Sequence, residues 1–130
     1  MTVRIKHKCN VRIATDTDMK NILFGPDDTL SEVIIDTFTK HTSGNFTLLD
    51  TEDEDLSLGD IDAVKGFYLY SDNDIKLSIN GGAAIQMRQN TGTGTRAKFF
   101  IEADITSINV ENDTAGETVT GVWCAWGDTT

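Results

Sequence analysis

Residues 3–13 read VRIKHKCNVRI, and this stretch decides the fold class. Its odd positions are mainly apolar, whereas four of its five even positions carry Lys or Arg. A period of two over eleven residues predicts a β-strand with one buried face. The opposite face is then a basic stripe, formed by Arg4, Lys6, Lys8 and Arg12.

The rest of the chain is rich in strand and turn residues, with 18 Thr, 12 Ile, 11 Gly and one Pro. β-branched side chains fit a pleated, half-buried surface, and Gly, Asn and Asp favour turns. Short strands are expected over residues 45–49, 67–70, 75–79, 84–88, 98–102, 105–110 and 117–126. The sequence SDND at 71–74 predicts a hairpin turn. The last strand is apolar on both faces, which indicates a central strand or one covered by another subunit.

One helix is expected near residues 29–41. Thr29 and Glu32 have the spacing of a capping box, and apolar residues follow with helical periodicity. The β-branched run 33–35 leaves a strand open as the alternative. We therefore expect a single mainly β domain over residues 1–130: an antiparallel β-sandwich or jelly-roll-like barrel of about eight strands with that short helix.

The charge is strongly negative and unevenly placed. The chain has 21 acidic and 11 basic residues, a formal net charge of −10, which argues against a general nucleic-acid binder and against docking on an anionic membrane. Residues 1–20 carry five bases and two acids (+3), and residues 21–130 carry six bases and nineteen acids (−13). The uneven distribution of charge along the chain, unlike the net charge, indicates contacts with other proteins.

The acids are densest at 50–62, with seven acids and no base. This segment is a solvated loop, a calcium site or a contact for a basic partner; the EF-hand pattern is absent because Asp55 stands where its glycine would be. One hypothesis pairs the basic stripe of one copy with this segment of a neighbour, so that charge fixes orientation. The residues concerned are Glu52, Asp53, Glu54 and Asp55. A solvated strand face, or an edge protected by Lys and Arg, is the alternative for the stripe.

Catalytic and cofactor chemistry finds little support. The two histidines, His7 and His41, have no orienting partner in the sequence pattern. Cys9 and Cys124 match neither a zinc nor a redox spacing, and buried free thiols are favoured over a disulfide. No signal peptide and no stretch of about 20 apolar residues is recognised. We expect a non-enzymatic protein with no catalytic, cofactor-binding or metal-binding residue.

About half the chain resembles small virion proteins of tailed bacteriophages. The features are GFYLY at 66–70, the acidic turn after it, IKLSINGG at 75–82, FFIEADIT at 99–106 and the Trp-rich last strand. The resemblance implies a β-sandwich or jelly roll that decorates the capsid or joins head and tail components. It also implies symmetric packing against other virion proteins and no catalytic residues.

We therefore expect a virion structural protein, made in the host cytoplasm, that forms a homo-oligomer and contacts other virion proteins such as capsid or tail proteins. Its expected interfaces are strand edges, the basic first strand and the aromatic last strand with Trp123 and Trp126. Neither nucleic acid nor membrane is an expected partner. One alternative is a carbohydrate-binding β module for host attachment, with Tyr68, Tyr70, Trp123 and Trp126 stacking on sugar rings. A further alternative is an intracellular enzyme of unfamiliar type.

Overall fold

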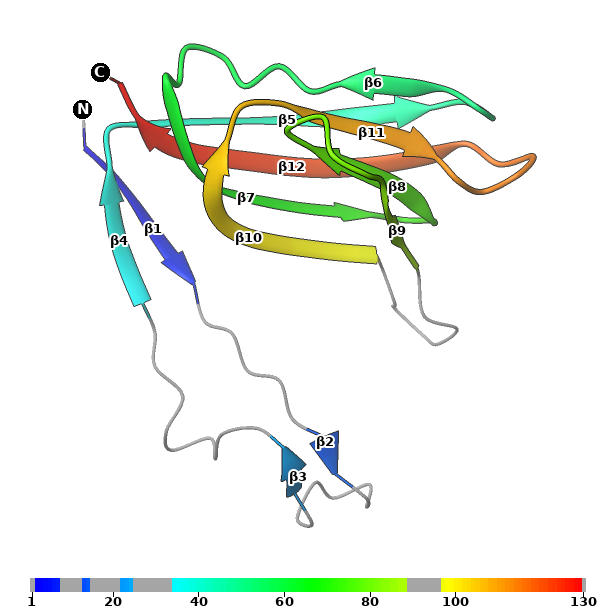
Figure 1. Ribbon diagram of the computed structural model, residues 1–130, viewed down its shortest axis with the longest axis horizontal. Helices are drawn as coiled ribbons and strands as arrows, with labels where there is room; N and C mark the ends of the chain where they lie inside the picture. The colour runs from blue at the N-terminus through cyan, green and yellow to red at the C-terminus, as the bar shows by residue number, and fades with distance from the viewer. Residues whose placement is uncertain (1, 8–12, 15–21, 25–33, 89–96, 130) are drawn as a thin grey trace. The chain divides into compact units, whose positions relative to one another are not determined.

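The computed structural model describes residues 2–7, 13–14, 22–24, 34–88 and 97–129 (Figure 1). The chain divides into two compact units, one made of Met1–Val3 with Phe38–Thr130 and the other of Arg4–Thr37. Near the N-terminus, β1 (Val3–His7) pairs with β4 (Ile34–Phe38), and β2 (Ile13–Ala14) pairs with β3 (Ile22–Phe24). Of the single strand expected at 3–13, residues 3–7 form β1 and Ile13 begins the separate strand β2, whereas residues 8–12 lie outside the described residues.

The larger unit contains two antiparallel four-stranded sheets, which we call the first and second sheet (Figure 1). The first sheet has the order β10-β7-β12-β5, and the second has the order β6-β11-β8-β9. Their strands are β5 (Lys40–Leu48), β6 (Asp53–Asp55), β7 (Ala63–Ser71), β8 (Ile75–Ile79), β9 (Ile85–Met87), β10 (Ala97–Ile105), β11 (Ile108–Asn112) and β12 (Val119–Asp128). The mainly β class is confirmed, and the arrangement is sandwich-like because both sheets contribute to one hydrophobic core.

The hairpin predicted at 71–74 is wrong. β7 belongs to the first sheet and β8 to the second, so the turn carries the chain from one sheet to the other. The Asp72 carboxylate accepts hydrogen bonds from the backbone N–H and the hydroxyl of Thr120, both at 2.9 Å. The Ser71 hydroxyl donates to the Asn73 carbonyl at 2.6 Å. These bonds fasten the turn to β12 and satisfy its polar groups without strand pairing.

The helix expected at 29–41 is wrong where the structure describes it. Residues 34–38 form β4 and residues 40–48 form β5. The β-branched residues of this stretch, including Ile34 and Ile35, fit a strand better than a helix. The proposed capping box at Thr29 and Glu32 lies outside the described residues. Gly44, shortly after the end of the expected helix, lies inside β5 opposite Trp123.

The core is built from the inward positions of both sheets. Phe67 and Trp123 stack there with ring centroids 6.2 Å apart. Phe46 packs over Gly121, where an added Cβ would come 2.2 Å from the ring. β12 lies between β7 and β5, so the prediction of a central last strand is confirmed.

Candidate interaction surface

The outer face of the first sheet is aromatic and partly exposed. Alternate residues of each strand point away from the core, because the intervening residues fill it. Phe100 is 39% exposed and Val122 is 37% exposed, and Tyr68 and Tyr70 are half-buried beside them. The two tyrosine rings lie 6.1 Å apart. We call this surface the aromatic face.

The strand register arranges the aromatic face in three rows of four residues, read in the order β10, β7, β12 and β5. The rows are Glu102–Gly66–Trp126–His41, Phe100–Tyr68–Cys124–Ser43 and Lys98–Tyr70–Val122–Asn45. The middle row therefore has a phenyl, a phenol and a thiol side by side. One acid and one base stand at the β10 ends of the two flanking rows.

The outer face of the second sheet has the opposite character. Its outward positions are polar or charged: Asp53, Asp55, Lys76, Ser78, Gln86, Asn109 and Glu111. Lys76 lies opposite Glu111 in the register, as expected for a solvated surface with paired charges. Because only one of the two outer faces is aromatic, the aromatic face is the better candidate for contact with another molecule.

Trp126 anchors one side of the aromatic face. It is 3% exposed and does not belong to the core shared by the two sheets. Its ring lies across Gly66, and the ring of Phe100 is 6.0 Å away at a tilt of 32°. The absence of a side chain at Gly66 gives this large ring a place on the sheet.

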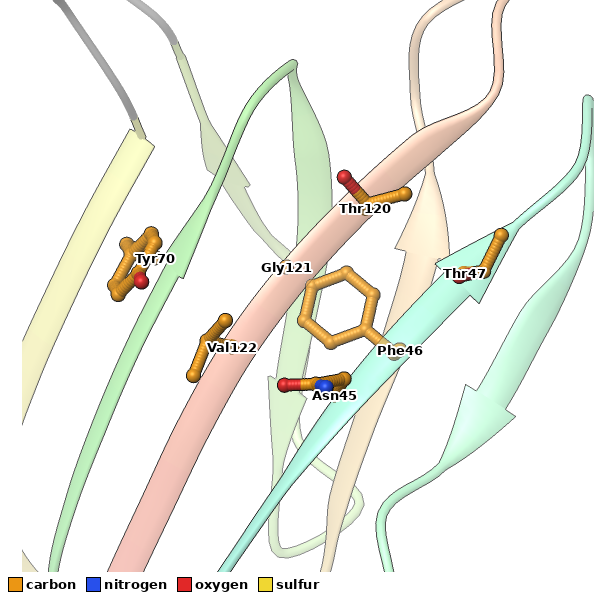
Figure 2. Close-up of a pocket in the computed structure, with 7 residues that line it drawn as sticks. All are labelled: Asn45, Phe46, Thr47, Tyr70, Thr120, Gly121 and Val122. Atoms are coloured by element: carbon orange, nitrogen blue, oxygen red, sulfur yellow. The ribbon is translucent and has the colours of Figure 1, made fainter.

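A shallow hollow of about 340 Å³ opens at the other side of the aromatic face (Figure 2). It is lined by Asn45, Phe46, Thr47, Tyr70, Thr120, Gly121 and Val122. Figure 2 shows Tyr70 on β7 at one flank, Val122 on β12 in the middle and Asn45 on β5 at the other flank. The hollow thus combines two aromatic rings, those of Phe46 and Tyr70, with amide and hydroxyl groups.

Cys124 is a free, half-buried thiol in the middle row. Burial raises the pKa of this thiol, against a smaller lowering by a hydrogen bond with the Tyr68 backbone. Cys124 is free, as expected, but half-buried where a buried thiol was expected, and Cys9 lies outside the described residues. A thiol whose pKa is raised is a poor nucleophile at neutral pH.

The acidic segment forms part of the second sheet's edge. Asp53, Glu54 and Asp55 are exposed on β6, which pairs with β11 alone among the strands that the structure describes. The Asn109 amide donates to the carboxylates of Asp53 and Asp55, each at 2.9 Å. Glu52 accepts a hydrogen bond from the backbone N–H of Leu49 at 2.9 Å. Three of the four acids proposed as a partner contact therefore have local hydrogen bonds.

Asp60, near the end of the acidic segment, is paired with a cation. The Lys40 ammonium lies 2.8 Å from its carboxylate, and this hydrogen bond lowers the pKa of Asp60. In the part of the chain that the structure describes, no three His, Cys, Asp or Glu side chains are placed to share a metal ion. Among the same residues, no helix is long and apolar enough to cross a membrane.

The remaining residues proposed from the sequence are those of the basic stripe and Trp123. Arg4 is exposed on β1, Lys6 is also on β1, and Lys8 and Arg12 lie outside the described residues. Trp123 is 5% exposed and packs in the core, unlike its neighbour Trp126 on the aromatic face.

Sequence reasoning missed the contribution of β10 to the surface. Phe99 packs against the core, whereas Phe100 points outward between Lys98 and Glu102. The signal was two consecutive phenylalanines, because neighbouring residues of a strand face opposite sides and one of the two must leave the core. His41, expected near a helix end, instead lies exposed on β5 opposite Trp126.

Comparison with protein-family models finds no match, and comparisons with curated proteins and with solved structures find no significant match.

Proposed function

We propose that this chain is a non-enzymatic structural protein of a tailed-phage virion, acting as a capsid decoration or as a head–tail or tail component. It assembles with copies of itself and with other particle proteins. The observation that carries the proposal is the aromatic face. It exposes aromatic rings on the outer face of the first sheet, whereas the outer face of the second sheet is polar. Exposed aromatic surface of this kind is typical of protein contacts.

The resemblance of residues 66–126 to phage virion proteins supports the virion setting. The finer fold that we propose is a β-sandwich in which consecutive strands mostly alternate between the two sheets, rather than a closed barrel. A sandwich presents two outer faces, so one can be solvated while the other packs on a neighbour.

The test is the location of the chain after particle assembly. Particles from a lysate of the host that carries the gene are purified on a density gradient and analysed by quantitative mass spectrometry. We expect the chain, detected by its peptides, to sediment with the major capsid protein. The molar ratio of the two proteins should stay the same through a second gradient. Recovery only at the top of the gradient would overturn the proposal.

The hollow favours carbohydrate binding as a second candidate function. A tyrosine ring beside asparagine and threonine groups can stack on a sugar ring and hydrogen-bond its hydroxyls. The test measures the binding of purified host surface polysaccharide to the chain by isothermal titration calorimetry. Tyr70→Ala should abolish binding, whereas Tyr68→Ala, which alters the same face outside the hollow, should retain it. Equal loss in both variants, or no binding by the native chain, would exclude this function.

A further inference from the structure

We propose that two copies of this chain pack their aromatic faces together about a two-fold axis, with Lys98 of each copy opposite Glu102 of the other. The inference deepens the proposed function and rests on its self-assembly. It names both the surface and the symmetry of the contact.

The two charges of the aromatic face lie symmetrically about Phe100 on β10. Lys98, Phe100 and Glu102 point outward from one strand, and each charge is two residues from the phenyl ring. Two residues along a strand span about 6.8 Å, so the charges flank Phe100 at equal distances. They are the only Lys, Arg, Asp or Glu residues in the three rows of this described face, and they cancel.

This spacing of the two charges is compatible with a two-fold axis. When two identical sheets face each other, their two-fold axis lies in the plane between them. An axis that runs across the strands, over the row Phe100–Tyr68–Cys124–Ser43, places each strand against itself in the opposite direction. Lys98 then faces Glu102 of the partner, and Glu102 faces Lys98 of the partner. An isologous interface requires this kind of self-complementarity.

An axis along the strands lacks this advantage. It places β10 of one copy over β5 of the other, so that Lys98 lies over Asn45, Glu102 lies over His41, and no Lys–Glu pair forms. The charge pattern therefore selects the axis across the strands, because it gives two ion pairs at each dimer contact.

The aromatic face is of a size that suits a weak contact. Its three rows cross four strands spaced by about 4.8 Å and extend over two steps of about 6.8 Å along the strands, which gives roughly 19 by 20 Å with the side chains included. This is about half of the roughly 800 Å² that each partner contributes to a standard interface, as is usual for weak or transient contacts. The phenyl and tyrosine rings at its centre are of the residue types that supply most binding energy in such contacts. We expect association in the micromolar range.

The first experiment exchanges the charges in the full-length chain and measures mass by sedimentation equilibrium. Lys98→Glu and Glu102→Lys should each raise the dissociation constant of the dimer about tenfold or more, because each replaces two attractions by two repulsions. An equimolar mixture of the two variants should form a heterodimer with near-native affinity. In that mixture every opposed pair again has opposite charges.

Glu117→Lys is the control, since it reverses an exposed charge outside the aromatic face. The Lys98→Glu/Glu102→Lys double variant should also recover the native affinity. A native chain that remains monomeric at millimolar concentration overturns the inference. So does a dimer whose dissociation constant is unchanged by the single reversals, because another surface then forms it.

The second experiment uses the thiol in the middle row. Cys124 lies on the row above the axis, so the two Cys124 residues face each other in the dimer. In a Cys9→Ser background and at mildly alkaline pH, which offsets the raised pKa of the Cys124 thiol, a short bismaleimide should give a covalent dimer of the otherwise native chain and far less of it with Lys98→Glu. Equal yields in the two proteins would contradict the proposed arrangement.

These outcomes are separable from the proposed virion role. If the chain forms a dimer with the predicted charge behaviour but is absent from particles, the proposed interface stands and the virion role is overturned. Incorporation into particles by a chain that never forms this dimer would do the reverse.

Discussion

The indole ring of Trp126 occupies the place where a side chain at position 66 would begin. The two residues are direct partners in the pairing of β12 with β7. A Cβ added to Gly66 would lie 2.2 Å from Cε2 and 2.3 Å from Cζ2 of the indole, which is closer than real carbon atoms approach. The ring is 3% exposed and packs beside Phe100, so it can move only by disturbing that contact.

Gly66→Ala is therefore expected to lower the free energy of unfolding by about 1–3 kcal/mol through overpacking. The measurement is urea denaturation followed by circular dichroism. In a Trp126→Ala background the same change should cost much less, because the added methyl group then has space. Gly44→Ala, where an added Cβ would meet Trp123 at 3.1 Å, is the milder control. Equal costs of Gly66→Ala in both backgrounds would show that the ring is not the cause.

The buried amide of Asn112 joins segments distant in sequence. It is 6% exposed, and its nitrogen donates to the carbonyls of Leu48, Leu49 and Glu117 at 2.7–3.1 Å. Its oxygen accepts from the backbone N–H of Thr114 at 2.7 Å. Asn112→Ala leaves several of these groups without partners, and each unsatisfied buried group costs about 1–3 kcal/mol.

We expect Asn112→Ala to lower the free energy of unfolding by about 2–4 kcal/mol, measured by urea denaturation. Asn45→Ala is the matched control, since Asn45 is exposed on β5 and should change stability by less than about 0.5 kcal/mol. The explanation fails if the two variants lose similar amounts.

The sequence predicted strands well where the pattern was local and failed where it depended on distant partners. Period-two alternation located the strand at 75–79 with its observed bounds, and apolar residues on both faces marked β12 as central. The helix near 29–41 failed because its apolar spacing fits two periods, and pairing with β12 decided for a strand at β5. Propensity is a weak guide where tertiary pairing supplies the hydrogen bonds.

The candidate surface was predictable only in part. Tyr68, Tyr70 and Trp126 were recognised as aromatic residues at strand spacing, and all three lie on the aromatic face. Trp123 differs from Trp126 by three positions, an odd number, so the two point to opposite sides of β12. Which of them faces the core depends on the second sheet, and the pairing of the sheets does not follow from local pattern. The match of Lys98 with Glu102 across an axis likewise requires the register.

Acid should weaken the fold through Asp113. Its carboxylate accepts a hydrogen bond from the Arg88 guanidinium and lies 3.7 Å from the Lys76 ammonium. The Arg88 hydrogen bond holds the pKa of Asp113 below its ordinary value, despite partial burial. A group whose pKa is lower in the folded chain adds stability above its unfolded pKa of about 3.9, and that stability is lost as pH falls through the folded pKa.

Arg88→Ala should therefore be less stable than the native chain at pH 7, and the difference should shrink as pH falls below about 4. Urea midpoints between pH 7 and pH 2 measure it. The control is an Asp113→Asn background, in which Arg88→Ala should give a difference that varies far less with pH, because the carboxylate that Arg88 pairs with is gone. A gap between Arg88→Ala and the native chain that is constant with pH would contradict the role of the ion pair.

The acids of β6 are expected to protect the edge of the second sheet. β6 pairs with β11 on one side. Glu54 lies opposite the buried Val110, at a register position that faces the core, but its side chain is exposed. A charge at such a position opposes the addition of another strand. Glu54→Val/Asp55→Thr should therefore speed aggregation, measured as turbidity and thioflavin fluorescence at 37 °C, with little change in the urea midpoint. Asp50→Asn/Glu117→Gln removes the same charge away from this edge and is the control. If the two double variants aggregate equally fast, the loss of net charge is the cause, and the prediction that the acids of β6 protect this edge is wrong.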